Sequence, residues 1–346
     1  MERVRVDLGE KSYDIYIGDG ILNQLDQLIG PSEEQGFIIS DRNVYRLHGH
    51  RLDSLQGYEW IIIEPGEESK SLVRASHVLE QMLNLGGSRK SKLIAFGGGV
   101  VGDLGGFCSS VYMRGIDYIQ IPTSLLAQVD SSVGGKTAIN FLGHKNIIGS
   151  FHQPSRVIVD TSLLTSLAER EILNGLGEIV KYGIIYDYEL FKYIGKNIGK
   201  IKNLDREIMP YLIGRCCQIK GEIVARDEKE EGLRKILNFG HTLAHGLESI
   251  TNFSKYSHGQ AVIIGMYQET LLAKRLGIVD SHYSDQLLEF LTSLGVDLSI
   301  GDYPSSQLVD FMLKDKKNRA GKISFILPIE KGRVKEYLLD KNQIGW

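Results

Sequence analysis

Residues 92–106 read Lys92-Leu-Ile-Ala-Phe-Gly97-Gly-Gly99-Val-Val-Gly102-Asp103-Leu-Gly-Gly106, an apolar segment that runs directly into a cluster of glycines. A short apolar run that ends at glycine predicts a buried strand, and the apolar residues after the turn predict a helix. The glycines match the G-x-G-x-x-G spacing at a strand–turn–helix junction, where backbone amides and a helix N-terminus bind pyrophosphate. The sequence therefore favours nucleotide or phosphate binding here, with a purely structural turn as the alternative.

Outside this segment, predicted strands and helices alternate through the first half of the chain. Residues 2–17 predict a hairpin, and further strands are expected at 36–41, 60–66, 92–96, 117–122 and 156–160, with helices at 21–30 and 71–85. This alternation is typical of a parallel sheet with helices on its faces. After about Ser166 the pattern becomes mostly helical, with a helix expected from Glu169 to Tyr188 and a closing hairpin near 322–338. We predict an α/β Rossmann-like domain over 1–165 and a mostly α-helical domain over 166–346.

Composition excludes several classes of function. The 346 residues have a formal net charge of −3, so no basic field favours nucleic acid. No apolar run reaches the roughly 18 residues of a membrane span, and the N-terminus has no secretory signal pattern. Three cysteines, two of them adjacent, do not make a disulfide framework. We expect a cytoplasmic enzyme that has no membrane or nucleic-acid partner.

A histidine-rich segment, Asn238-Phe-Gly-His241-Thr-Leu-Ala-His245-Gly-Leu-Glu248, is followed by His258 at the start of another apolar run. Asn238 is a candidate helix cap, and His241 and His245 are spaced to share one helical face. Three imidazoles near apolar helices, with the carboxylate of Glu178 available upstream, favour a divalent metal site. Histidines that simply satisfy their hydrogen bonds in the core are the alternative.

Two glycine-framed lysine segments follow the predicted strand at 117–122. The first, Asp130-Ser-Ser-Val-Gly-Gly-Lys136-Thr, resembles the tail of a P-loop but has Asp where the strict motif requires Gly. The second is Gly143-His-Lys145-Asn146. Lysine in such a frame suits phosphate oxygens, whereas solvated surface lysines are the alternative.

Six segments together resemble the 3-dehydroquinate synthase family of sugar-phosphate cyclases, over nearly the whole chain. They are GGGVVGDLGGF (97–107), VYMRGIDYIQIPTSLLAQVDSSVGGKT (111–137), GHKNIIGSFHQP (143–154), GEIVKYG (177–183), EEGLRKILNFGHTLAHGLE (230–248) and HGQAV (258–262). The resemblance implies a Rossmann-like N-terminal domain, a helical C-terminal domain, NAD, a zinc or cobalt ion, and a homodimer.

The resemblance also implies site residues, position by position. Metal ligands would be Glu178, His241 and His258, which leaves His245 to relay a proton. The NAD site would comprise Asp41, Asn43, Glu67, Lys70, Gly98, Gly99, Asp103, Thr123, Ser124, Asp130, Lys136, Lys145 and Ser166. The substrate would contact Asp130, Lys136, Asn146, Lys181, Lys220, Arg234, Asn238, and one of Lys316 or Lys317, with Arg114 reaching across from the partner subunit. Ser166 and Ala168 depart from the usual family residues near the domain hinge.

The implied substrate is 3-deoxy-D-arabino-heptulosonate 7-phosphate, and the implied product is 3-dehydroquinate in the shikimate pathway of aromatic amino acid biosynthesis. The route is transient oxidation by NAD, β-elimination of phosphate, reduction and intramolecular aldol closure. Other classes stay open: 2-deoxy-scyllo-inosose or aminodehydroquinate synthase, a metal-dependent polyol dehydrogenase, and a non-catalytic sensor of NAD or metal.

Overall fold

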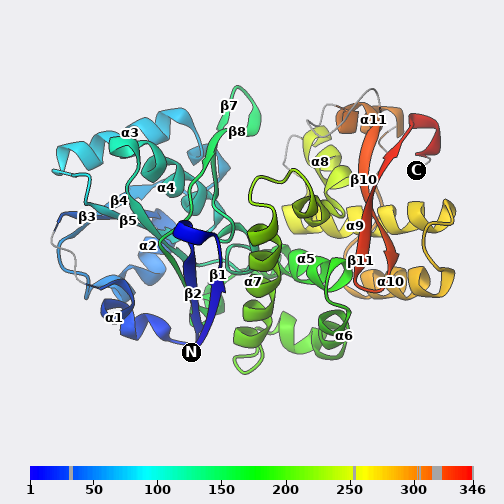
Figure 1. Cartoon of the computed structure of the whole chain (residues 1–346), viewed down its shortest axis with the longest axis horizontal. Helices are drawn as coiled ribbons and strands as arrows, with labels where there is room; N and C mark the ends of the chain where they lie inside the picture. Colours follow the sequence, from blue (N-terminus) through cyan, green and yellow to red (C-terminus); the bar gives the residue numbers. More distant parts are fainter. Residues whose placement is uncertain (31–33, 252–254, 302, 304, 314–321, 345–346) are drawn as a thin grey trace. The chain divides into compact units, whose positions relative to one another are not determined.

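A computed structural model describes residues 1–30, 34–251, 255–301, 303, 305–313 and 322–344 (Figure 1). Internal contacts divide the chain into two compact units, which are not simply its two halves. Unit 1 comprises Met1–Ile172 and Asn203–Lys229, and unit 2 comprises Leu173–Lys202 and Glu230–Trp346. The division into functional domains at residue 166 stays a prediction.

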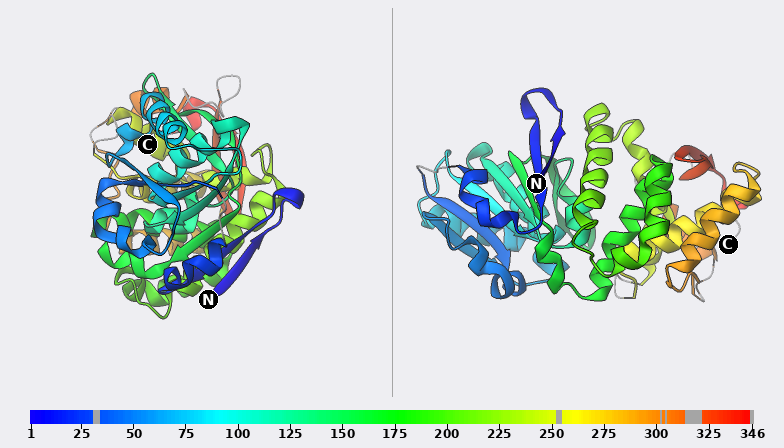
Figure 2. Two further views of the ribbon diagram at one scale, coloured as in Figure 1. Left: turned by 90° about the vertical axis from the view of Figure 1, so that its left-hand side faces the viewer. Right: turned by 90° about the horizontal axis from the view of Figure 1, so that it is seen from below.

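Unit 1 is built on a seven-stranded sheet, counted over the described residues (Figures 1 and 2). Its order is β1-β2-β9-β6-β5-β3-β4, in which β1 and β2 form an antiparallel pair and every other neighbouring pair is parallel. These strands are β1 (Glu2–Val6), β2 (Tyr13–Gly18), β3 (Gly36–Asp41), β4 (Tyr58–Ile63), β5 (Lys92–Gly97), β6 (Asp117–Pro122) and β9 (Arg156–Asp160). The predicted N-terminal hairpin and the predicted parallel sheet are confirmed.

The strands of this sheet send alternate side chains to two apolar cores. Phe37 and Ile39 of β3 join one core, and Ile38 joins the other, as the two-residue period of a strand requires. The first core is completed by α3 (Leu72–Asn84) and α4 (Gly99–Val111), and the second by the segments Ile21–Gln24, Leu25–Ile29 (α1) and Gly49–Leu52. The remaining α-helices among the described residues of unit 1 are α2 (Arg42–His48) and α7 (Met209–Arg226). Helix α7 contacts β1 and β2.

The glycines after β5, at the turn and within α4, have two physical consequences. A Cβ on Gly102 would lie 2.8 Å from Gln120 Oε1, and one on Gly106 would lie 2.4 Å from Thr137 Cγ2. These two glycines therefore let α4 pack closely on its neighbours, which is one of the roles of glycine in such turns. Gly98, the cap residue of α4, makes no side-chain capping bond, so the first amides of α4 have no cap from that residue.

A second hairpin in unit 1 was not predicted. Strands β7 (Lys136–Phe141) and β8 (His144–Phe151) pair antiparallel and contain Lys136 and Lys145, the lysines of the two glycine-framed segments. The amide of Asn140 donates to the carbonyl of Lys70 at 2.8 Å, which ties β7 to the turn before α3. Alternation of polar and apolar residues is weak in this hairpin, because much of it is exposed.

Unit 2 is mostly helical and carries the predicted C-terminal hairpin (Figure 1). Its elements are α5 (Glu169–Ile185), which begins in unit 1, α6 (Tyr188–Lys202), α8 (His241–Ile250), α9 (His258–Arg275), α10 (Ser281–Ser293), α11 (Ser305–Leu313), β10 (Ile323–Glu330) and β11 (Arg333–Leu339). The predicted helix from 169 to 188 ends at Ile185 instead, because Asp187 starts α6 by accepting from the amide of Leu190 at 3.0 Å. Across the described residues, none of the helices combines the length and apolar character needed to cross a membrane.

Candidate metal centre and surrounding site

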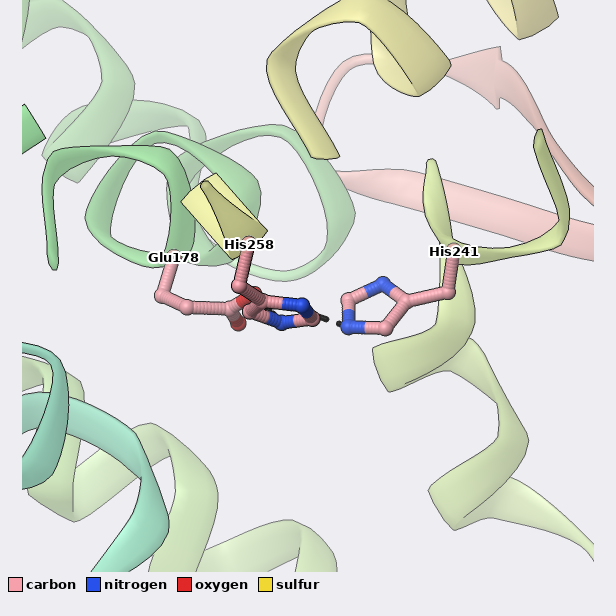
Figure 3. A group of neighbouring side chains, drawn as sticks. All are labelled: Glu178, His241 and His258. Atoms are coloured by element: carbon pink, nitrogen blue, oxygen red, sulfur yellow. Dashed lines mark ion pairs between the residues drawn. The ribbon is translucent and has the colours of Figure 1, made fainter. Parts of the chain in front are cut away.

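Three side chains of unit 2 converge at one point (Figure 3). Glu178 lies on α5, His241 is the first residue of α8, and His258 is the first residue of α9. One ligand atom from each lies within 4.8 Å of the others. The Nε2 atoms of His241 and His258 are 3.6 and 3.7 Å from Glu178 Oε1. Such separations suit one ion, because two ligands each about 2.0–2.1 Å from a tetrahedral zinc are roughly 3.3 Å apart.

The burial of Glu178 supports a cation at this point. Its side chain is 1% exposed, and Oε1 has no hydrogen-bond partner within the described structure. Lys181, one turn later, forms a buried ion pair with Oε2, whereas Oε1 faces the two imidazoles. A buried carboxylate is costly unless it is paired or coordinates a metal. Two imidazoles and one carboxylate are also a common catalytic zinc ligand set, so these residues fit a divalent ion.

Hydrogen bonds outside the ligand set orient both imidazoles. His241 Nδ1 lies 3.1 Å from the carbonyl of Phe239, and His258 Nδ1 lies 3.3 Å from Glu248 Oε1. Each of these acceptors favours the imidazole tautomer in which Nδ1 carries the proton and Nε2 is available to bind a metal. Burial acts to lower the pKa of His258, but the hydrogen bond and charge of Glu248, together with the charge of Glu178, hold that pKa above its ordinary value. Sequence reasoning missed the role of Glu248.

A glycine beside Glu178 and another beside His258 bring α5 and α9 together. A Cβ on Gly177 would lie 2.9 Å from the carbonyl oxygen of Gly259, and one on Gly259 would lie 2.4 Å from Asn174 Cα. Asn174 Oδ1 accepts from the amide of Gly259 at 3.0 Å. The separation of two ligands is therefore set by backbone contact between their helices.

The prediction that Asn238 caps the histidine helix is wrong. Helix α8 begins at His241 with Gly240 as its cap residue, at a φ of 80°. Asn238 ends a 3-10 segment, Leu233–Asn238, and its side-chain amide donates to Glu230 Oε1 at 2.6 Å and to the carbonyl of Lys235 at 3.1 Å. The cap is instead supplied from α9 by Glu269, whose Oε2 accepts from the amide of Gly240 at 2.7 Å.

The structure describes two further predicted residues of unit 2, His245 on α8 and Arg234 just before it. The ring of His245 is 5.7 Å from that of His241, and His245 is outside the group of three ligands, as the family resemblance implied. Arg234 belongs to the Leu233–Asn238 segment and is 2% exposed. Lys316 and Lys317 lie outside the described residues.

Five of the predicted NAD residues lie at the carboxyl ends of three strands or directly after them: Asp41 at the end of β3, Gly98 and Gly99 after β5, and Thr123 and Ser124 after β6. Lys70 and Asp103 form an ion pair, with the lysine side chain 6% exposed. Burial raises the pKa of the Asp103 carboxyl, against the opposing charge of Lys70. Thr123 and Ser124 follow β6, and the Ser124 Oγ is 3.5 Å from where a Cβ on Gly98 would lie, beside Gly99.

Other members of that set have structural partners. Asp41 Oδ1 caps α2 by accepting from the amides of Asn43 and Val44 at 2.8 and 3.0 Å. Glu67 Oε1 accepts from Asn140 Nδ2 at 2.8 Å, and Ser166 Oγ is 2.8 Å from His48 Nε2. Roles for these residues in NAD binding stay predictions.

The predicted substrate residues of unit 1 lie at three places. Lys220 of α7 lies 2.9 Å from Asp130 Oδ1 and donates to the Asp130 carbonyl at 2.7 Å, so these two residues meet. Lys136 and Asn146 lie on the exposed β7–β8 hairpin, as does Lys145 of the predicted NAD set, and Asn146 has a φ of 53°. Arg114 is exposed and has a φ of 71° after α4.

Comparison with known proteins decides the family. Residues 60–174 match the profile of the 3-dehydroquinate synthase N-terminal region, and residues 175–318 match that of the C-terminal region. A 3-dehydroquinate synthase from Alkaliphilus metalliredigens is 49% identical over 100% of this chain and 98% of its own length. The chain belongs to the 3-dehydroquinate synthase family. Another member, from Caldanaerobacter subterraneus subsp. tengcongensis, is 45% identical over 96% of both chains.

Solved structures agree with this family fold. A 2-deoxy-scyllo-inosose synthase complexed with carbaglucose-6-phosphate, NAD+ and Co2+ superposes with a TM-score of 0.90 at 22% identity, over 99% of this chain and 98% of the other. A 2-epi-5-epi-valiolone synthase from Streptomyces hygroscopicus subsp. jinggangensis with NAD+ and Zn2+ bound gives 0.87 at 26% identity, over 97% and 96%. A probable glycerol dehydrogenase from Sinorhizobium meliloti gives 0.64 at 16% identity, over 88% and 90%. The predicted family and fold class are confirmed.

Proposed function

We propose that this protein is a 3-dehydroquinate synthase, which converts 3-deoxy-D-arabino-heptulosonate 7-phosphate into 3-dehydroquinate and phosphate. The observation that carries this proposal is the convergence of Glu178, His241 and His258 in a chain that matches the family along its length. The proposed cofactors are NAD and one zinc or cobalt ion, the groups bound by the two cyclases described above. When bound, the metal ion would polarise a substrate hydroxyl, and NAD would accept and return one hydride.

The charges at the centre suit an anionic ligand. Glu178 and Lys181 cancel as a buried ion pair, and both imidazoles are held in the tautomer that binds metal. A divalent ion added here outweighs the one further negative charge, that of Glu248 beside His258, and the remaining positive charge favours a substrate oxygen that loses its proton. His245, one helical turn after His241, would receive and return that proton.

We assign binding roles to residues of each unit separately. In unit 2, Arg234 would hold the substrate carboxylate by a bidentate fork, with Asn238 and Lys181 as further contacts. In unit 1, Asp130 and Lys220 form a charged pair, and Lys136, Lys145 and Asn146 of the hairpin suit phosphate oxygens. Glu67, Lys70, Asp103 and the amides at the start of α4 would hold NAD. Phosphate elimination requires no strong protein base, because the leaving phosphate can itself remove the proton.

We also propose a cytoplasmic homodimer in which Arg114 reaches the phosphate of the neighbouring subunit. The exposure of Arg114 supports this role, because an exposed side chain is accessible to a partner subunit. Mass measurement in solution tests the dimer. Mixing Arg114→Ala subunits with subunits that carry His241→Ala tests the crossing, since one fully intact site should form in the mixed dimer.

The proposed activity is tested by supplying the heptulosonate phosphate with NAD and zinc. We expect stoichiometric release of inorganic phosphate without net absorbance at 340 nm, because the hydride returns to the product. Net NADH formation would favour a polyol dehydrogenase, and neither signal would favour a binding protein. Faster turnover of glucose 6-phosphate or of the amino analogue of the substrate would assign a related cyclase instead.

A further inference from the structure

We propose that Glu269 is a positioning residue of the metal centre: it fixes the start of α8 so that His241 meets His258. This inference rests on the proposed metal site and concerns a residue outside the ligand set. Glu269 lies on α9, eleven residues after His258, and is fully buried.

The contacts of Glu269 reproduce a capping box from another helix. In a capping box, side chains satisfy the amide of the cap residue and the amide three residues later. Here Glu269 Oε2 accepts from the amide of Gly240 at 2.7 Å, and Oε1 lies 3.4 Å from the amide of Leu243. These are the two amides concerned, and Gly240 has no side chain with which to cap its own helix.

The cap residue must be glycine because α9 leaves no room for a side chain. A Cβ on Gly240 would lie 2.7 Å from Met266 Cγ, and one on Gly265 would lie 1.9 Å from the carbonyl oxygen of Gly240. Gly265 and Glu269 are one turn apart, so they share a face of α9. On that face of α9, Gly265 contacts the carbonyl of Gly240, and Glu269, one turn later, binds the amide of Gly240.

This arrangement makes α9 the common support of two ligands. His258 is the first residue of α9, and Glu269, which binds the amide of Gly240 next to His241, lies further along the same helix. The distance between the two imidazoles therefore depends on how the start of α8 is held against α9, and the Glu269 carboxylate makes that contact. A purely stabilising role for Glu269 would predict weaker folding without a specific change in metal binding.

The test is Glu269→Gln in the full chain, with zinc affinity measured by chelator competition and ligand geometry by the visible spectrum of the Co2+ form. Glutamine keeps the shape but offers one acceptor oxygen and a donor NH2, so one amide of α8 loses its partner. We expect zinc affinity to fall about 10- to 100-fold, as is typical when residues that orient metal ligands are changed. The Co2+ spectrum should change with it.

Two controls separate positioning from general stability. Glu289→Gln removes an exposed carboxylate on α10, and Leu287→Ala opens a cavity in the buried face of the same helix. Both should keep wild-type zinc affinity, although Leu287→Ala lowers the melting temperature. Unchanged affinity in Glu269→Gln, or an equal loss in Leu287→Ala, would overturn the proposal.

Hydrogen exchange of the wild-type protein covers the case in which Glu269→Gln does not fold. The Gly240 and Leu243 amides should be protected before metal is added, and rapid exchange there would reject the proposal. Failure of the wild type to bind zinc at all would instead count against the proposed metal site.

Discussion

Replacing Gly259 with alanine should separate the helices that carry two of the three ligands. The new Cβ would lie 2.4 Å from Asn174 Cα, whereas ordinary van der Waals contact begins at 3.4 Å. The backbones must therefore part by 3.4 − 2.4, or about 1 Å, immediately beside His258. Backbone atoms cannot rotate out of the way as a side-chain end can, so the movement is passed to the ligand.

Two magnitudes follow from this displacement. Overpacking of this kind costs about 1–3 kcal/mol of the free energy of unfolding. A misplacement of about 1 Å at a catalytic group can lower the rate about 100-fold. The matched control is Gly199→Ala in α6, where a Cβ meets nothing within 4 Å. That change should stabilise the protein by about 0.5–1 kcal/mol, because alanine is the better helix former.

Both variants would be compared by urea unfolding, zinc affinity and phosphate release. The reasoning predicts loss of stability, affinity and rate in Gly259→Ala, and none of these losses in Gly199→Ala. A Gly259→Ala protein that binds zinc and turns over substrate like the wild type would refute the idea that contact between α5 and α9 sets the ligand spacing.

Three further changes test other parts of the account. Lys181→Met should destabilise the metal-free protein by about 3–5 kcal/mol, because it leaves the Glu178 carboxylate buried without its cation. In urea unfolding, saturating zinc should recover part of this loss. An equal loss with and without zinc would contradict the prediction. Glu248→Gln should weaken zinc binding about 10-fold in a chelator competition, because the amide is a poorer acceptor for His258 Nδ1. Wild-type affinity would show that the contact between Glu248 and His258 does not contribute to zinc binding. Burial acts to raise the pKa of Asp14, but Arg3 and Arg5 outweigh it and hold that pKa below its ordinary value. The carboxylate therefore adds stability above about pH 4 that is lost as the pH falls through the folded pKa. Asp14→Asn should remove this contribution to acid unfolding, about 1 kcal/mol or less, and an unchanged acid profile would count against it.

Local sequence patterns were sufficient for most of the fold. The apolar run before Gly97 predicted β5, and Ser71 marked the start of α3 within one residue, because both signals depend on neighbouring residues. Local patterns did not show that α7 packs on β1 and β2, or that residues 136–151 form a hairpin. Those outcomes depend on contacts between distant residues, which no short window contains.

The metal site divides in the same way. Reasoning from the residues gathered three imidazoles and the Glu178 carboxylate, and spacing favoured a pairing of His241 with His245. Only the family resemblance removed His245 from the ligand set and left Glu178, His241 and His258. Glu248 and Glu269 carried no local signal, since each acts on a group in another helix. Asn238 was assigned as a cap from residue type, although the chain reaches its cap two residues later at Gly240.

X-ray absorption at the zinc edge of the loaded wild-type protein tests the central claim most directly. The account predicts two imidazole nitrogens and oxygen donors at about 2.0–2.2 Å, with one imidazole lost in each of His241→Ala and His258→Ala. A sulfur shell at about 2.3 Å, or an imidazole signal unchanged by both substitutions, would contradict it.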